Sequence, residues 1–376
     1  MAFKFNTKTD RFVIIGSIAA LLILLTIFLV RGCSKQHVYY DKPVENEDEI
    51  IENYEEPEEE KEEYTDLRPL SLLTGLPTDY KEKLNQRPFA AVITNSSEAW
   101  PHSGIAAADI IYEVMVEGVN TRMVAIFQSE LPEKIGPIRS IRDYFVDIAF
   151  NHDAMLVHHG SSPGGLDRMS ALGIERFDGM QLEGSIFWRD QTRPDWFGGT
   201  RGLEHSSFTG GEGLLTHMEN RGDRATFSDN HDFVFIFDEI PANIESNGSA
   251  KYIRVPFSFT YPRIFVFDEE IGAYLVENAN SPLLDAENRE QVVVANVLIQ
   301  FTPISVIDNA GRLAVTTVGS GDGLLARDGQ YFPVRWEKSS HTAPMRWYFE
   351  NDEPVVLSAG NTWINIVHTS TNIIFE

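Results

Sequence analysis

An uninterrupted apolar segment, residues 12–30, limits most strongly what this chain can fold into. Its sequence, FVIIGSIAALLILLTIFLV, has 19 residues without a charge, and a helix of that length spans about 28 Å, close to the hydrocarbon core of a bilayer. Lys4, Lys8 and Arg11 precede it and are expected to hold its start on the cytoplasmic side. We therefore expect residues 1–35 to be a membrane anchor or lipoprotein signal, with the bulk of the chain extracytoplasmic.

The single cysteine, Cys33, lies three positions after the end of this segment. In a bacterial lipobox an aliphatic residue stands three positions before the lipidated cysteine and small residues stand between them. Val30 and Gly32 fit that pattern and Arg31 does not. The apolar run is also longer than the roughly 7 to 15 residues of a cleaved signal peptide. Two interpretations stay open: a lipid on Cys33, or an uncleaved spanning helix.

About half of the net charge of −25 lies in one stretch of the chain. Residues 41–66 contain 14 Asp and Glu against Lys42 and Lys61. Such a stretch cannot bury enough apolar surface to offset its ordering entropy. Residues 36–70 are therefore predicted to be a disordered acidic spacer. The acidic composition argues against nucleic-acid binding, which needs a basic face.

The rest of the chain is predicted to have an α+β fold. Residues 71–230 combine strand and helix patterns, which predicts a mixed α/β domain. Residues 231–376 consist of short β-rich runs separated by turn residues, including the hairpin signal Asp328-Gly329, which predicts a mainly antiparallel β domain. The clearest local patterns are a strand near 89–94, a hairpin over 109–128, a helix near 141–149, a strand over 154–159 and helices near 163–172 and 212–220.

The motif GSSPG, residues 160–164, matches the G-x-S-x-G pattern of a hydrolase nucleophile elbow. In that architecture the residue after the serine donates its backbone N–H to the oxyanion hole, and here that residue is Pro163, which has none. The pattern fits a helix start better, with Ser162 as the N-cap and Pro163 at the first helical position.

Arg139 and Arg142 flank Ser140, the expected N-cap of the helix that follows. Positive charge at a helix N-terminus is disfavoured by the macrodipole, so their placement suggests that they bind a phosphate or carboxylate. The alternative is that they form ion pairs with Glu113, Glu117 or Asp143.

Further cationic and small polar residues of the same region extend this candidate site. Arg122 follows the hairpin turn, Arg189 lies in FWRDQTR, and His158 ends the strand before GSSPG. Because successive strand residues face opposite ways, His158 and His159 are not expected to share a metal ion, and we predict no metal or cofactor. The predicted anion-binding residues are Arg122, Arg139, Arg142, His158, Ser161, Ser162 and Arg189.

Several stretches, including EKIGPIRSIRDYF, VHHGSSPGGLD, FWRD, VRWEK and LSAGNTWINIV, make the chain similar to the YerB-like family of bacterial lipoproteins. The resemblance spans about residues 72–367. It implies two domains without an assigned biochemical function and a lipid anchor at the outer membrane face, which would place the lipid on Cys33. Where members of the family have a His-Asn pair, this chain has His205 followed by Ser206.

These observations predict a membrane-tethered extracytoplasmic binding protein that recognises an anionic cell-envelope polymer. One alternative is an envelope hydrolase or transferase, with His158 or His205 as base and Ser161 or Ser162 as nucleophile. Another is a scaffold protein that contacts an envelope partner through its β-rich region. The sequence identifies no catalytic residue.

Overall fold

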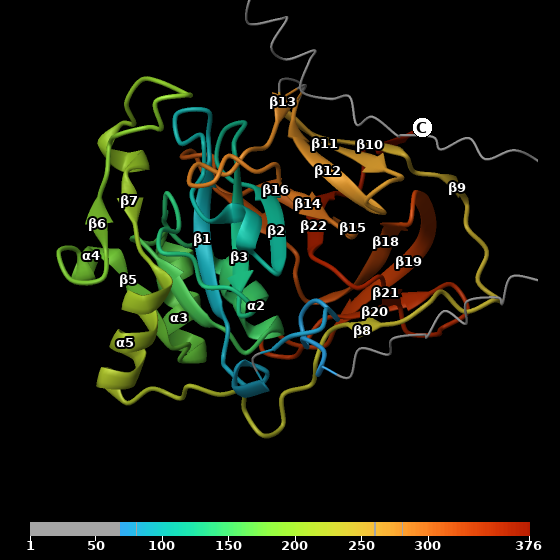
Figure 1. The fold of residues 1–376 in the computed structure, drawn as a ribbon, viewed down its shortest axis with the longest axis horizontal. Helices are drawn as coiled ribbons and strands as arrows, with labels where there is room; N and C mark the ends of the chain where they lie inside the picture. The colour runs from blue at the N-terminus through green and yellow to red at the C-terminus, as the bar shows by residue number, and fades with distance from the viewer. Residues whose placement is uncertain (1–67, 80, 259–260, 280) are drawn as a thin grey trace, which may run out of the picture. The chain divides into compact units, whose positions relative to one another are not determined.

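The computed structural model describes residues 68–79, 81–258, 261–279 and 281–376 (Figure 1). All of the described residues belong to one compact unit. The predicted anchor, Cys33 and residues 36–67 of the predicted spacer lie outside the described residues. In the part of the chain that the structure describes, no helix has both the length and the apolar character needed to cross a membrane.

A mixed sheet of eleven strands forms the centre of this unit. Its strand order is β20-β19-β18-β15-β22-β2-β3-β1-β4-β5, and β9 pairs with β19. The strands are β1 (Phe89–Asn95), β2 (Ile110–Met115), β3 (Thr121–Phe127), β4 (Met155–His158), β5 (Arg176–Asp178), β9 (Gly248–Ser249), β15 (Asn296–Thr302), β18 (Gly319–Arg327), β19 (Gln330–Lys338), β20 (Arg346–Phe349) and β22 (Thr362–His368).

A second, six-stranded antiparallel sheet packs its buried residues into the same core as one face of the large sheet. Along β10 and β12 buried and half-buried residues alternate, as expected for a sheet with one covered face. Its strands are β10 (Tyr252–Ser258), β11 (Tyr261–Asp268), β12 (Ala273–Asn278), β13 (Ser281–Pro282), β14 (Val293–Val294) and β23 (Ile374–Phe375). Two-stranded pairs are β16 (Ile304–Val306) with β17 (Leu313–Val315), β8 (Ile236–Phe237) with β21 (Val356–Leu357), and β6 (Trp188–Arg189) with β7 (Ser207–Phe208).

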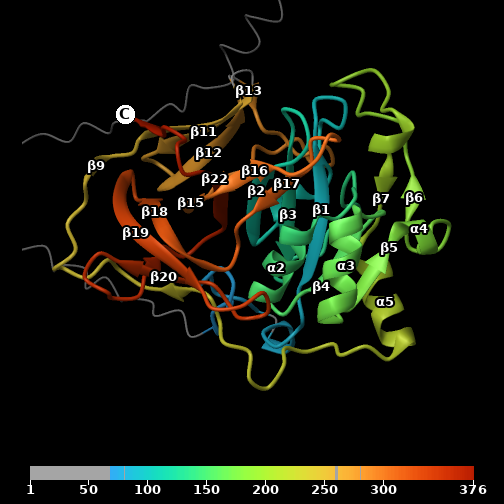
Figure 2. The ribbon, with the colours of Figure 1, turned by 180° about the vertical axis from the view of Figure 1, so that it is seen from behind.

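The helices belong to the N-terminal half of the described chain. They are α2 (Asp143–Asn151), α3 (Pro163–Leu172), α4 (Gly179–Leu182) and α5 (Gly211–Arg221), and 3-10 turns occur at Lys81–Lys83, Ile105–Ala107 and Leu203–His205. α2 and α3 pack against each other beside β3 and β4 (Figure 2). The predicted helices near 141–149, 163–172 and 212–220 are confirmed.

The predicted fold class is confirmed, with a mixed N-terminal region and a mostly antiparallel C-terminal region. The two regions share the large sheet, because β22 lies between β15 and β2 and runs parallel to both. The predicted boundary near residue 230 therefore falls within one compact unit. The Asp328-Gly329 hairpin also forms, and both residues have positive φ, as a type I′ turn requires.

One local prediction was wrong. Ser140 is not the N-cap of α2, because the helix begins at Asp143 and Arg142 occupies the cap position without a side-chain cap. The Ser140 hydroxyl instead donates a hydrogen bond to the carbonyl of His159, at 3.0 Å. The residue therefore joins the segment before α2 to the end of β4.

Candidate functional site

A pocket of about 610 Å³ opens where β4 turns into α3. Five other segments complete it: the chain before α2, the end of β5, the start of α4, β6, and the 3-10 turn at Leu203–His205. The lining residues are Ile138, Arg139, Ser140, His159, Gly160, Ser161, Asp178, Met180, Arg189, Leu203 and Glu204. Three predicted anion-binding residues, Arg139, Ser161 and Arg189, are thus brought together.

The turn after β4 is held in one conformation by its neighbours. Gly160 has a φ of 77°, and a Cβ added there would lie 3.3 Å from the Ser140 hydroxyl oxygen. The Gly160 N–H donates to Asp178 Oδ1 at 2.9 Å. Glycine is therefore the residue that fits this turn, and the turn presents the exposed Ser161 to the pocket.

The two arginines of the pocket differ in how they are paired. Arg189 contacts the Glu183 carboxylate at 2.9 Å and donates to the Leu203 carbonyl at 3.0 Å. Arg139 is half-buried and donates one hydrogen bond, 2.8 Å long, to the carbonyl of Glu204. No described carboxylate lies within ion-pair distance of Arg139, and burial lowers the pKa of its guanidinium. Arg139 is the arginine of this pocket with donors left for a ligand.

Arg122 and Arg142 lie close to Arg139 but outside the pocket lining. Arg142 forms a two-pronged ion pair with Glu117, at 2.7 and 2.6 Å, as the alternative interpretation of the sequence anticipated. Arg122 is buried and donates to the Ser140 carbonyl. Burial, followed by repulsion from Arg142, lowers the pKa of Arg122 to about 9. Both arginines lie near enough to Arg139 for their charges to interact, and Glu117 offsets that of Arg142.

His159, rather than the predicted His158, lines the pocket. His158 is buried and its Nδ1 lies 2.9 Å from the Gly160 carbonyl oxygen. His159 contacts Arg189 through Nε2 at 2.9 Å and the Ser207 hydroxyl through Nδ1 at 2.7 Å. Because a guanidinium only donates, Nε2 accepts, and we assign the proton to Nδ1. Burial and the charge of Arg189 lower the pKa of His159, which favours this neutral form.

Ser162 caps α3, as predicted. Its hydroxyl oxygen accepts a hydrogen bond from the Gly165 N–H at 3.1 Å, and Pro163 is the first helical residue. A serine–histidine pair does exist at the pocket, but it joins His159 to Ser207 on β7. The sequence offered no local signal for that pair, because the partners are far apart along the chain.

Glu98, Glu204 and His205 each place one potential ligand atom within 4.8 Å of the others. His205 Nε2 lies 3.1 Å from a Glu98 carboxylate oxygen. Both glutamates are exposed, and exposed carboxylates often gather in this way without a metal ion. We assign no metal site to them.

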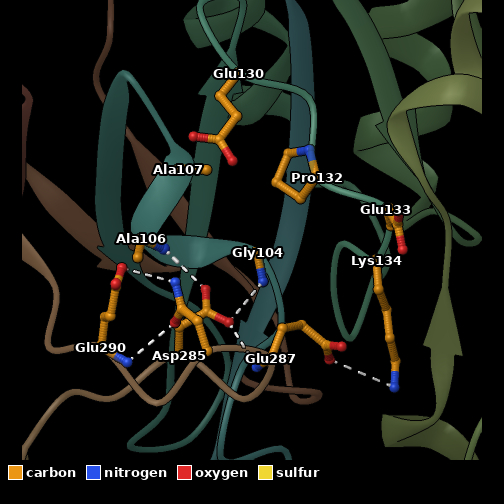
Figure 3. A pocket seen from close by; sticks show the side chains of 11 residues that line it. Gly104, Ala106, Ala107, Glu130, Pro132, Glu133, Lys134, Asp285, Glu287 and Glu290 are labelled. Atoms are coloured by element: carbon orange, nitrogen blue, oxygen red, sulfur yellow. Dashed lines mark hydrogen bonds and ion pairs between the residues drawn. The ribbon is translucent and has the colours of Figure 1, made fainter.

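A second pocket, of about 310 Å³, is lined by charged side chains, most of which are carboxylates (Figure 3). Its central residue, Asp285, accepts hydrogen bonds from the N–H groups of Gly104 at 3.2 Å, Ala106 at 3.0 Å and Glu287 at 2.9 Å. Burial raises the pKa of Asp285. Because its carboxylate is satisfied by these backbone groups, Asp285 fastens its own loop to the 3-10 turn at Ile105–Ala107.

Known proteins resemble the chain over most of the described part. Residues 73–224 match the N-terminal domain model, and residues 253–364 the C-terminal domain model, of "Protein of unknown function (DUF3048)". The chain is 31% identical over 300 residues to "Putative lipoprotein YerB" of Bacillus subtilis (strain 168), covering 78% of this chain and 85% of that protein. The crystal structure of YerB protein from Bacillus subtilis matches with a TM-score of 0.70 and 27% identity, covering 82% of this chain and 100% of that one.

Proposed function

This chain belongs to the DUF3048 family, and from that premise we propose that it is a membrane-tethered extracytoplasmic protein that binds an anionic ligand in the pocket beside β4. The observation that carries the proposal is Arg139. It is a half-buried guanidinium that forms no ion pair among the described residues, and the nearby Glu204 carboxylate is the main charge that attracts it. A cation in such a place is stabilised when an anion reaches it.

The arginines around Arg139 favour an anionic ligand over a neutral one, while Asp178 and Glu204 in the same lining carry negative charge. Electrostatic repulsion acts between Arg139 and three other arginines, Arg122, Arg142 and Arg189. The turn at Gly160 and Ser161 adds an exposed hydroxyl on the same side. The net charge of the chain is −25, so the protein as a whole repels anions. The attraction for an anionic ligand therefore comes from the arginines at this pocket. A phosphate- or carboxylate-bearing polymer of the cell envelope fits this chemistry.

We expect replacement of Arg139 by alanine to weaken binding of such a ligand about tenfold or more, since a hydrogen bond to a charged group contributes about 1.5 to 3 kcal/mol. Calorimetric titration of the full chain with glycerol-phosphate oligomers and with polyglutamate would measure this. The matched control is Arg335→Ala, because Arg335 lies on β19 and already pairs with Glu337 and Asp352. Equal affinities for the Arg139 variant and the unmodified chain would rule out the site.

We further propose that Cys33 carries the lipid that anchors the protein, as the description of the Bacillus subtilis relative supports. Mass spectrometry of the mature protein is expected to find Cys33 as an acylated N-terminus. Cys33→Ser is expected to keep the whole N-terminal segment attached. A mature chain that still begins at Met1 or Ala2 would leave the apolar segment as the anchor and Cys33 without a role in attachment.

A further inference from the structure

A third pocket, of about 390 Å³, is apolar and lies apart from the arginine pocket. It forms where three parts of the described chain meet, at the upper edge of Figure 1. They are the loop after β1, the long loop between β6 and β7, and Asn278 at the end of β12 together with residues 281–284. Aromatic, proline and leucine side chains dominate its wall, chiefly Trp100, Pro101, Trp196, Phe197, Pro282 and Leu283.

The loops around this pocket are fastened to one another, so its wall is largely formed in advance. Arg201 is buried and donates to the carbonyls of Ala99 at 3.2 Å, Pro101 at 2.7 Å and Thr192. One guanidinium thereby joins the loop after β1 to the loop between β6 and β7. Trp100 adds a hydrogen bond from its indole N–H to Asn95 on β1, at 3.0 Å.

Two large aromatic residues of the wall stay open to solvent. Trp196 is 37% exposed and Phe197 is 42% exposed. Burying such side chains would contribute about 25 cal/mol per Å² of apolar surface. A loop that is fixed in place and still exposes two aromatic rings beside a hollow is typical of a binding surface.

Two arginines border these rings. The guanidinium of Arg193 lies 5.2 Å from the centre of the Phe197 ring, and that of Arg289 lies 5.4 Å from the Trp196 ring. Arg193 donates to the backbone carbonyls of Ser97 and Glu98. In the described part of the chain, neither arginine forms an ion pair with a carboxylate.

Arg335 is an arginine of this protein whose charge is balanced by carboxylates. It too stacks on an aromatic ring, 4.3 Å from the centre of Tyr348. It also pairs with the carboxylates of Glu337 and Asp352. Arg193 and Arg289, which contact aromatic rings of the pocket wall without lining the pocket themselves, therefore carry positive charge that an acidic head group would complement.

We propose that this pocket binds a single-chain anionic amphiphile, with the hydrocarbon chain against Trp100, Trp196 and Leu283 and the carboxylate or phosphate on Arg193 and Arg289. The lining offers few polar side chains, chiefly Asn278 and Ser281, to bond the hydroxyls of a sugar. Its volume lies near the lower end of ligand pockets, about 300 to 1,000 Å³, which suits one chain. The acidity of the whole protein disfavours docking on an anionic bilayer surface.

The test uses the full chain in its membrane and a fatty acid that carries a photoactivatable diazirine. After irradiation, mass spectrometry is expected to find label on peptides that contain Trp100, Trp196 or residues 281–284. Unlabelled decanoate is expected to compete for this labelling, and 1-decanol at the same concentration is expected to compete about tenfold less, because it has no charge to pair with the arginines.

Two variants test separately the binding of the hydrocarbon chain and the binding of the acidic head group. Trp196→Ala is expected to abolish labelling at the pocket, and Arg289→Gln to lower it about tenfold. The matched control, Arg335→Gln, is expected to leave it unchanged. Three outcomes would each overturn the proposal. The first two are equal competition by decanol and labelling confined to residues 12–30. The third is labelling by a photoactivatable phospholipid without any by the fatty acid, which would indicate a bilayer surface instead.

Discussion

Replacing Glu113 by glutamine is expected to destabilise the folded protein by about 3 to 5 kcal/mol, because it leaves a buried arginine charge without its counter-ion. Glu113 on β2 and Arg263 on β11 are both fully buried. Their side chains meet at 2.8 and 3.2 Å. Asn95 and Thr121 donate further hydrogen bonds to the same carboxylate, at 2.8 and 2.6 Å. The pair therefore joins the two large sheets through a satisfied polar network.

Urea unfolding followed by tryptophan fluorescence would measure this loss, since the Trp363 ring lies 4.8 Å from the Arg263 guanidinium. The double variant Glu113→Gln with Arg263→Met is expected to cost less than the sum of the two single variants, because it removes both charges at once. Additive single effects would show that the two side chains do not stabilise each other.

Acidification is expected to destabilise the protein steeply between pH 6.5 and about 3. His102 and His152 are buried, and burial lowers the pKa of each to about 3. Below pH 6.5 the unfolded chain takes up a proton at each histidine while the folded chain does not. Each histidine therefore contributes stability that is present above pH 6.5 and is lost as the pH falls toward 3, on the order of 4 kcal/mol per residue at the acid end.

The titration of Asp109 changes the stability in the opposite direction, over a narrower pH range. Burial raises its pKa to about 6. Its protonated form favours the folded state below about pH 4, and that stabilisation is lost as the pH rises through 6. The expected gain on acidification is smaller than the combined loss from His102 and His152. Stability should therefore still fall between pH 6 and 3.

The measurement is the free energy of unfolding at a series of pH values for the unmodified chain and for His102→Gln and His152→Gln. Glutamine can keep a hydrogen bond to the Thr94 carbonyl or the Tyr112 hydroxyl, which now lie 2.9 Å from the histidines, and it does not titrate. Each variant is expected to have a shallower pH dependence, even if it is less stable at neutral pH. Unchanged slopes in both variants would contradict the assignment.

Local sequence patterns predicted the features that depend on neighbouring residues. Ser162 and Pro163 start α3 because a cap needs only the residues of its own helix. The Asp328-Gly329 turn forms because both positions adopt positive φ. Where the outcome depended on distant segments, the local signal failed: Ser140 bonds to the end of β4 instead of capping α2.

The candidate site shows the same division. The sequence marked Arg139, Arg189 and Ser161, and the structure places all three in one pocket. It also marked His158, whereas the neighbouring His159 faces the pocket. Strand alternation predicts that these two histidines face opposite ways, but it does not say which face carries the pocket, because that depends on where β6 and β7 lie.

By itself the sequence determined the apolar N-terminal segment, the acidic stretch after it, the α+β class and most local elements. These follow from hydrophobic periodicity, capping and turn chemistry, which act over a few residues. Tertiary structure alone decided that β22 joins β15 to β2, that Glu113 meets Arg263, and that Trp100 shares a pocket with Trp196. Those contacts join residues 66 or more positions apart. Strand order and register across such separations depend on which faces the whole chain can bury together.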